Sequence, residues 1–285
     1  MTARLAAQEG LLTWTPGGGP TPWADGAAKE TSDHASGRAS AEPLLVADSW
    51  LLAEGRVRGY GRHRERFLRA CAESGACGEP GGPGPRRLVE FWHDMTAALP
   101  RTGEWFPRVE LAAGSLELRL RLRKAPPLGT QVRLWSAGQP DPRGVPRHKG
   151  PDLDALAGVR ARAVAEGAQE APLVDASGTV LESATASVLW WEGDTLCLPP
   201  DGAPVLPGVT AGLIQERAAR SAVPVAHRRR TVAELSGREV WLVNALHGIR
   251  PVTSWTDDTM KAGPATKAAE WRNWLDNLTE PLPHT

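Results

Sequence analysis

The sequence predicts a mixed α/β protein whose chain divides into a small N-terminal domain and a larger C-terminal domain. The first half contains two helical segments, over residues 60–77 and 87–98, and a strictly alternating strand at Leu116–Arg123. A proline- and glycine-rich break at Lys124–Gly129 follows that strand and is typical of a domain junction. The second half alternates helices with short hairpins, which completes the pattern of a mixed fold.

The first 42 residues are rich in Gly, Pro, Ala and Ser, and we expect a flexible segment there, with Leu12–Trp14 as a short strand. Ordered structure should begin near Pro43. The small domain is therefore expected over 43–125 and the large domain over 130–285.

The second half contains a regular series of elements. In its first helix Leu153, Leu156, Val159 and Ala163 share one face. Further helices are expected over 210–222 and 264–278, and strands over 172–175, 179–181, 187–191, 195–198 and 239–243.

Arginines alternate with leucines in the Leu116–Arg123 strand. Such a row can contact nucleic acid. A strand with one solvated face, or a face turned toward an anionic ligand, explains it more simply.

Composition excludes several classes of protein. The 285 residues contain 33 basic and 33 acidic side chains, so net charge gives no reason to expect nucleic acid or an anionic membrane as partner. No apolar run approaches the length of a membrane span, and the N-terminus does not resemble a secretory signal. Three cysteines, Cys71, Cys77 and Cys197, favour a reducing cytoplasm and no metal site.

Three features along the second half together suit pyridoxal phosphate. Lys149 is one of five lysines and can form a Schiff base with the cofactor aldehyde. Glu182 follows an apolar strand 33 residues later and can hold the pyridine nitrogen protonated. Gly208 opens a helix whose first amides, at Val209 and Thr210, can bind a phosphate.

From Arg147 to Val252 the chain resembles the class IV pyridoxal-phosphate aminotransferases, which include branched-chain and D-amino-acid aminotransferases and aminodeoxychorismate lyase. The matching pieces are Lys149, the Gly178–Glu182 turn, Leu206–Thr210 and Asn244–Val252. The resemblance implies the two-domain fold of that family, with a small N-terminal α/β domain and a larger cofactor-binding domain.

The resemblance also implies roles for further residues. Arg66, in the His63–Phe67 motif, would bind the cofactor phosphate, together with the amides of Val209 and Thr210. Asn244 and Ala245 would close the phosphate cup or border the substrate. A homodimer is implied as well, and the twelve tryptophans give it weak support, since aromatic residues are enriched at interfaces.

The chain departs from the family on the substrate side. Ser187 and Ala211 replace an asparagine and an arginine, and Asp154 stands where branched-chain enzymes have a tyrosine. Tyr60 is the one tyrosine of the chain. The stretch Leu52–Gly59 does not match the Gly-x-Phe-Glu-Thr strand of the family, and it has no threonine, which the lyases use in that strand.

Two enzyme functions and one binding function follow. The first is an aminotransferase acting between an amino acid and a keto acid, with Lys149 as catalytic residue. The alternative is an aminodeoxychorismate-lyase-type enzyme that releases pyruvate and forms an aminobenzoate. The third is a non-catalytic, arginine-rich binding protein on the same fold.

Overall fold

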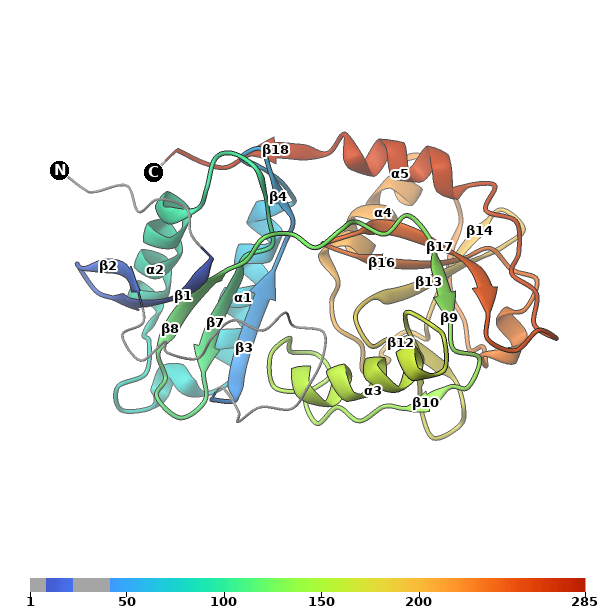
Figure 1. Cartoon of the computed structure of the whole chain (residues 1–285), viewed down its shortest axis with the longest axis horizontal. Coiled ribbons are helices and arrows are strands. Elements are labelled where there is room, and N and C mark those ends of the chain that lie inside the picture. The colour runs from blue at the N-terminus through green and yellow to red at the C-terminus, as the bar shows by residue number, and fades with distance from the viewer. Residues whose placement is uncertain (1–8, 23–41, 285) are drawn as a thin grey trace. The chain divides into compact units, whose positions relative to one another are not determined.

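The computed structural model describes residues 9–22 and 42–284 (Figure 1). The chain forms two compact units. One contains the residues up to Pro126 and those from Glu280 on, and the other spans Pro127–Thr279. The division after Pro126 lies inside the Lys124–Gly129 stretch. The last strand, β18 (Thr279–Pro281), pairs with β5 (Arg56–Arg58), so the end of the chain returns to the first unit.

The first unit is built on a five-stranded antiparallel sheet in the order β2-β1-β8-β7-β3. Helices α1 and α2 cover one of its faces (Figure 1). A second, smaller sheet has the order β18-β5-β4-β6. The bounds are β1 (Gly10–Thr15), β2 (Gly19–Pro22), β3 (Leu44–Ser49), β4 (Leu52–Ala53), α1 (Tyr60–Glu73), η1 (Ala76–Gly78), α2 (Pro85–Ala98), β6 (Glu104–Trp105), β7 (Arg108–Ala112) and β8 (Leu118–Leu122).

Two strands lie within the segment that the sequence predicts to be flexible. The expected Leu12–Trp14 strand is part of β1, where the buried Trp14 donates a hydrogen bond to Asp94 at 2.8 Å and packs edge-on against Phe91. The remainder of that segment, residues 1–8 and 23–41, is outside the described residues.

The arginines of β8 do not form a solvated row. Arg119 is 4% exposed and bonds to the carboxylates of Glu42 and Glu117. Arg121 and its cross-strand neighbour Arg108 both donate to the buried Glu110. Alternation did predict the strand, but the charged face consists of ion pairs, so it offers neither a wet surface nor a basic patch.

The second unit is built on a larger mixed sheet. Its main path is β10-β11-β12-β13-β16-β17-β9, and β14 pairs with both β13 and β15. The bounds are β9 (Val132–Leu134), β10 (Gln139–Pro140), α3 (Leu153–Ala165), β11 (Pro172–Val174), β12 (Val180–Ser183), β13 (Ser187–Glu192), β14 (Thr195–Leu198), α4 (Val209–Arg220), β15 (Val225–His227), η2 (Ala233–Leu235), β16 (Val240–Asn244), β17 (Gly248–Trp255) and α5 (Ala268–Asp276).

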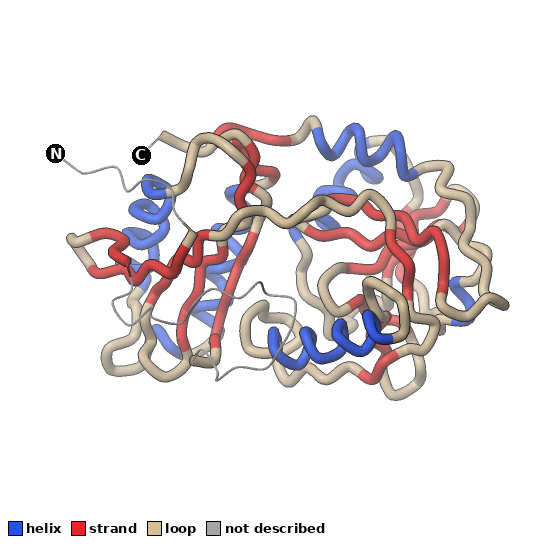
Figure 2. Tube along the Cα trace, in the orientation of Figure 1, coloured by secondary structure: helices blue, strands red, loops and turns tan. Residues whose placement is uncertain are grey.

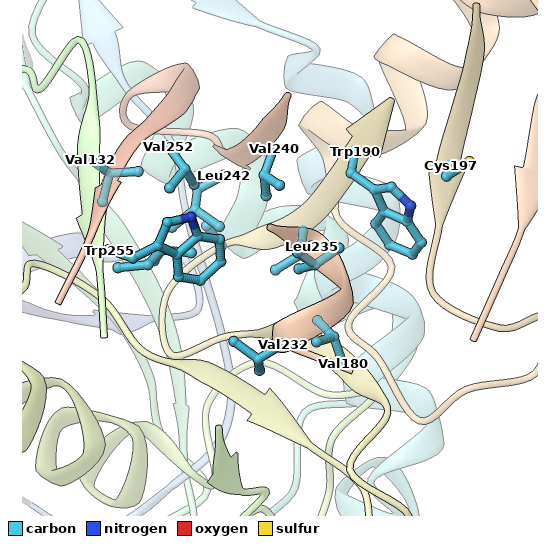
Figure 3. Packing of buried hydrophobic residues seen from close by; sticks show 13 residues of the cluster. Val132, Val180, Trp190, Cys197, Val232, Leu235, Val240, Leu242, Val252 and Trp255 are labelled. Carbon is cyan, nitrogen blue, oxygen red and sulfur yellow. The ribbon is translucent and has the colours of Figure 1, made fainter. Parts of the chain in front are cut away.

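Strand β13 separates two hydrophobic cores, because successive side chains point to opposite faces. Val188 and Trp190 belong to the cluster that Figure 3 shows, together with Leu242 of β16 and Val252 of β17. Leu189 and Trp191 belong to the other cluster, beneath α4 and α5. A third cluster, which includes Val159 and Ala163, attaches α3 to β11.

Two expected helices are shorter in the structure, for local reasons. The helix expected over 60–77 ends at Glu73, because Gly75 takes a left-handed φ of 81° before η1. The helix expected over 264–278 begins at Ala268, because Thr266 and Lys267 instead donate their backbone N–H groups to the Glu239 carboxylate.

Glu239 is 7% exposed and accepts hydrogen bonds from Ala268 N, from the Thr266 hydroxyl and from the Trp241 indole. Glu239→Gln removes the negative charge at the start of α5. It also replaces one accepting oxygen by an NH₂ group, which cannot accept the hydrogen bonds of the backbone N–H groups. The free energy of unfolding should fall by about 3 kcal/mol, the upper range for hydrogen bonds to a charged group.

Urea denaturation followed by tryptophan fluorescence measures this loss. Glu216→Gln is the control, because Glu216 forms an i,i+4 pair with Arg220 on the surface of α4. It should change stability by less than about 0.5 kcal/mol. Equal effects of the two substitutions would contradict the role given to Glu239.

Candidate functional site

Lys149 lies on the loop between β10 and α3, which Figure 2 shows in tan. Backbone contacts fix this loop: the Asp152 carboxylate accepts hydrogen bonds from the N–H groups of Gly144 and Val145, both at 3.0 Å. Gly150, directly after the lysine, is buried and has a φ of 136°, a conformation that side-chain-bearing residues rarely adopt. Lys149 is therefore presented by a short, internally bonded segment.

Glu182 is a buried carboxylate on β12, 5% exposed. Its Oε1 atom accepts hydrogen bonds from Arg143 Nη1 and from the backbone N–H of Leu206, the latter at 3.1 Å. Burial raises the pKa of Glu182 above its usual value, and the opposing charge of Arg143 limits that rise. The nearby guanidinium thus favours the ionised form of a carboxyl group that water no longer stabilises.

Arg143 comes from the same loop as Lys149 and was not among the residues that the sequence suggested. Its guanidinium forms a bidentate ion pair with Asp141, in which Nε donates to Oδ1 at 2.8 Å and Nη2 donates to Oδ2 at 2.7 Å. Further along the loop, Arg147 donates to the carbonyl oxygens of Gly202 and Ala203. The lysine loop is consequently tied to Glu182 and to the segment that leads into α4.

The N-terminus of α4 lies next to β13. A Cβ atom added to Gly208 would come within 2.7 Å of Ser187 Oγ, so glycine permits this close approach. The register pairs Ser187 with Glu182, which brings the start of α4 near the carboxylate. Val209 and Thr210 are both buried, and no side chain of the described residues caps the helix. Its first amide groups are available to an anion.

Asn244 and Ala245 lie in the turn between β16 and β17. The Asn244 side chain stabilises this turn by accepting hydrogen bonds from Leu246 N and His247 N, at 3.1 and 2.8 Å. It also donates to the carbonyl oxygen of Thr185, in the turn after Glu182. Glu182, the start of α4 and the Asn244 turn therefore meet at one end of strands β12, β13 and β16.

Arg66 belongs to the first unit, on helix α1. Its Nε and Nη2 atoms donate to the two oxygens of Asp48, both at 2.8 Å. His63 Nδ1 lies 2.8 Å from the same carboxylate. Asp48 is fully buried, which by itself raises its pKa, but the charges of Arg66 and His63 outweigh burial and hold the pKa well below its usual range.

The residues that depart from the family pattern have clear positions. Asp154 is exposed in the first turn of α3. Tyr60 is buried in the first unit, where its hydroxyl lies 2.5 Å from Thr96 Oγ1, and burial raises the pKa of the phenol to about 12.

No group of histidine, cysteine and acidic side chains suited to a metal occurs within residues 9–22 and 42–284. No helix in the described part of the chain has the length and apolar character needed to cross a membrane.

The chain belongs to the class IV aminotransferase family, because the profile of the family described as amino-transferase class IV matches residues 45–255, more than half of the sequence. This match confirms the resemblance found in the motifs, and with it the expectation of an enzyme of this class. Among curated proteins no sequence matches the chain.

Solved structures confirm the fold. A hypothetical aminotransferase from Mycobacterium tuberculosis is similar over 95% of this chain and 98% of its own, at 19% identity and a TM-score of 0.70. A fold IV transaminase from Curtobacterium pusillum covers 98% and 100%, at 18% identity and a TM-score of 0.69. A 4-amino-4-deoxychorismate lyase from Legionella pneumophila covers 82% and 90%, at 17% identity and a TM-score of 0.67.

The ion pair between Asp48 and Arg66 should stabilise the folded chain. Asp48→Asn removes the charge that offsets a buried guanidinium, and the free energy of unfolding near neutral pH should fall by about 3–5 kcal/mol. Because the folded pKa of Asp48 is depressed, its contribution is fully present above the unfolded carboxyl pKa of about 4 and is lost as pH falls.

The wild-type chain should therefore lose more stability than Asp48→Asn when pH is lowered from about 5 to about 2. Urea denaturation at a series of pH values measures both curves. Parallel curves would mean that Asp48 contributes no ionisation-linked stability.

Proposed function

We propose that this chain is a pyridoxal-phosphate-dependent aminotransferase that moves an amino group between an amino acid and a keto acid. The observation that carries the proposal is Glu182: it is buried, Arg143 and Leu206 both contact Oε1, and Oε2 accepts no hydrogen bond from the described residues. A carboxylate oxygen without a donor among the described residues, on a side chain that is otherwise buried, suits the protonated ring nitrogen of the cofactor.

The other groups of the second unit also fit the cofactor. The uncapped start of α4 offers the amides of Val209 and Thr210 to a phosphate, with the helix dipole adding attraction. The Asn244–Ala245 turn borders the same end of the strands. The role of Arg66 as a phosphate ligand rests on the sequence motif His63–Phe67. Two hydrogen bonds to the Asp48 carboxylate fix the plane of its guanidinium group.

Pyridoxal phosphate, when bound, supplies the electron sink that stabilises a substrate carbon after it loses a proton. Glu182 would hold a proton at the ring nitrogen and so strengthen that sink. The Lys149 amine would take the proton from the substrate α-carbon and return it to C4′ of the cofactor. The amides at the start of α4 would fix the phosphate and so orient the ring.

A lyase that releases pyruvate from aminodeoxychorismate is the second candidate. The sequence Asn244-Ala245-Leu246 before Pro251-Val252 favours it, because this turn is more like the lyase members of the family. Incubating the cofactor-loaded protein with a panel of amino acids and with aminodeoxychorismate discriminates between the two. A new keto acid and the aminated cofactor indicate transamination, whereas pyruvate and an aminobenzoate indicate the lyase.

A homodimer and a cytoplasmic location belong to the same proposal and rest on the resemblance and on the cysteine content. The tryptophan content no longer adds support for a dimer. Nine tryptophans of the described part are buried within the single chain: Trp14, Trp50, Trp92, Trp105, Trp190, Trp191, Trp241, Trp255 and Trp271. They form the core of each unit, which explains their number without an interface. Light scattering at micromolar concentration determines the assembly.

Lys149→Ala should abolish activity and covalent attachment of the cofactor. Borohydride reduction of the cofactor-loaded wild-type chain should fix the cofactor to one lysine, which mass spectrometry of the digested protein identifies. Lys261→Ala is the matched control, since Lys261 is exposed and lies outside the motifs that resemble the family. This variant should be labelled like the wild type. Labelling of Lys149→Ala at another lysine would show that Lys149 is not the cofactor lysine.

Glu182→Gln and Arg66→Ala should fail in different ways. Glu182→Gln cannot hold the ring proton by charge, so the rate at saturating cofactor should fall on the order of a hundredfold or more. Arg66→Ala should weaken cofactor binding by about 1.5–3 kcal/mol, and excess cofactor should restore much of the rate. Rescue of Glu182→Gln but not of Arg66→Ala by added cofactor would reverse the two assignments.

A further inference from the structure

Arg143 is the charged side chain that faces the candidate ring-nitrogen carboxylate. Its side chain is 4% exposed and that of Glu182 is 6% exposed. Asp141, two residues earlier, holds the opposite side of the same guanidinium at 2.7 and 2.8 Å. Asp141, Arg143 and Glu182 thus form a set of alternating charges in which Arg143 lies between the two carboxylates.

The guanidinium of Arg143 has no N–H group left for a substrate. Nε donates to Asp141, Nη1 donates to Glu182 and to the Pro146 carbonyl, and Nη2 donates to Asp141 and to the Pro204 carbonyl. These five contacts match the five N–H donors of an arginine. An arginine so satisfied does not bind a substrate carboxylate, and its effect on the reaction must pass through Glu182.

The charges of the three side chains explain why the set suits a cationic ring. With all three ionised, Asp141 and Glu182 contribute two negative charges and Arg143 one positive charge, so the set carries one net negative charge. A protonated pyridine nitrogen balances that charge. The contact of Arg143 with Oε1, together with the Leu206 N–H, also fixes the carboxylate plane and leaves Oε2 for the ring.

We propose that Arg143 is a positioning residue for the cofactor ring, which keeps Glu182 ionised in its buried setting and directs Oε2 toward the ring nitrogen. This inference rests on the proposed function. It assigns to the loop that carries Lys149 a second task, since the loop supplies both the proposed cofactor lysine and the cation that contacts Glu182.

Replacement of Arg143 by a neutral residue should make the affinity for the cofactor depend on pH. The charged groups that face Glu182 are Arg143 and Asp141 from the lysine loop, while β11, β13 and the segment before α4 contribute Leu173, Ser187 and the Leu206 backbone. Without Arg143, burial raises the pKa of Glu182 further, opposed by the hydrogen bond from the Leu206 N–H, so the free protein binds a proton there up to a higher pH. Binding of a protonated ring must then release that proton, and affinity becomes dependent on pH.

The test is the dissociation constant of pyridoxal phosphate, measured by equilibrium dialysis at a series of pH values on both sides of neutrality. Arg143→Gln should bind more weakly than the wild type at low pH and recover as pH rises. The added slope should approach a tenfold change in affinity per pH unit, the limit for release of about one proton. Arg86→Gln, at an exposed position of α2 where Arg86 pairs with Glu90, should match the wild type.

Two further variants separate charge from structure. Arg143→Lys retains the positive charge and should show the wild-type slope with weaker affinity, and it serves if Arg143→Gln does not fold. In a Glu182→Gln background, Arg143→Gln should add no slope, because the titrating group is gone. The Glu182→Gln background also controls for any other titration that the loss of Arg143 changes.

Each outcome has one meaning. Failure of the wild type to bind pyridoxal phosphate overturns the proposed function. A wild-type chain that binds, with Arg143→Gln showing the same affinity and slope, overturns the inference about Arg143 alone. An equal loss from Arg143→Gln in both backgrounds, with no change of slope, assigns Arg143 a purely structural role and also overturns the inference.

Discussion

The ion pair between Glu182 and Arg143 is the interaction on which the candidate site depends. A carboxylate that is 5% exposed loses the stabilisation of water, which raises its pKa, and the charge of Arg143 opposes that rise. The chain supplies that cation from the loop that carries Lys149 and anchors it with Asp141. One loop therefore carries both the proposed cofactor lysine and the cation that contacts Glu182.

The sheet of the second unit makes this arrangement possible. Strand β13 lies between two hydrophobic cores, and its first residue, Ser187, pairs with Glu182 on one side and with Val243 on the other. The absence of a side chain at Gly208 lets α4 begin directly beside Ser187. Packing on both faces of the sheet thus fixes the buried carboxylate of Glu182 relative to the uncapped start of α4, the two groups proposed to bind the ring nitrogen and the phosphate of the cofactor.

Sequence patterns predicted the features that depend on local order along the chain. Alternation predicted β8, two apolar runs flanking a Gly-containing turn predicted the hairpin of β13 and β14, and the Leu206–Thr210 motif predicted the start of α4. Features that depend on partners distant in sequence were missed. Arg143 is one of many arginines, and only the expectation that Glu182 is buried, combined with the need for a counter-ion, could have singled it out. Burial of Arg119 in ion pairs and of Asp48 against Arg66 likewise requires the packed structure.

The central claim, that Glu182 holds a proton on the cofactor ring, is tested most directly by nitrogen NMR of pyridoxal phosphate labelled with ¹⁵N in the ring. The chemical shift of this nitrogen distinguishes a protonated from a neutral pyridine and is independent of any assay of turnover. The account predicts a protonated ring nitrogen in the wild-type chain at neutral pH, and a neutral one in Glu182→Gln. A neutral ring nitrogen in the wild-type protein with the cofactor bound would contradict it.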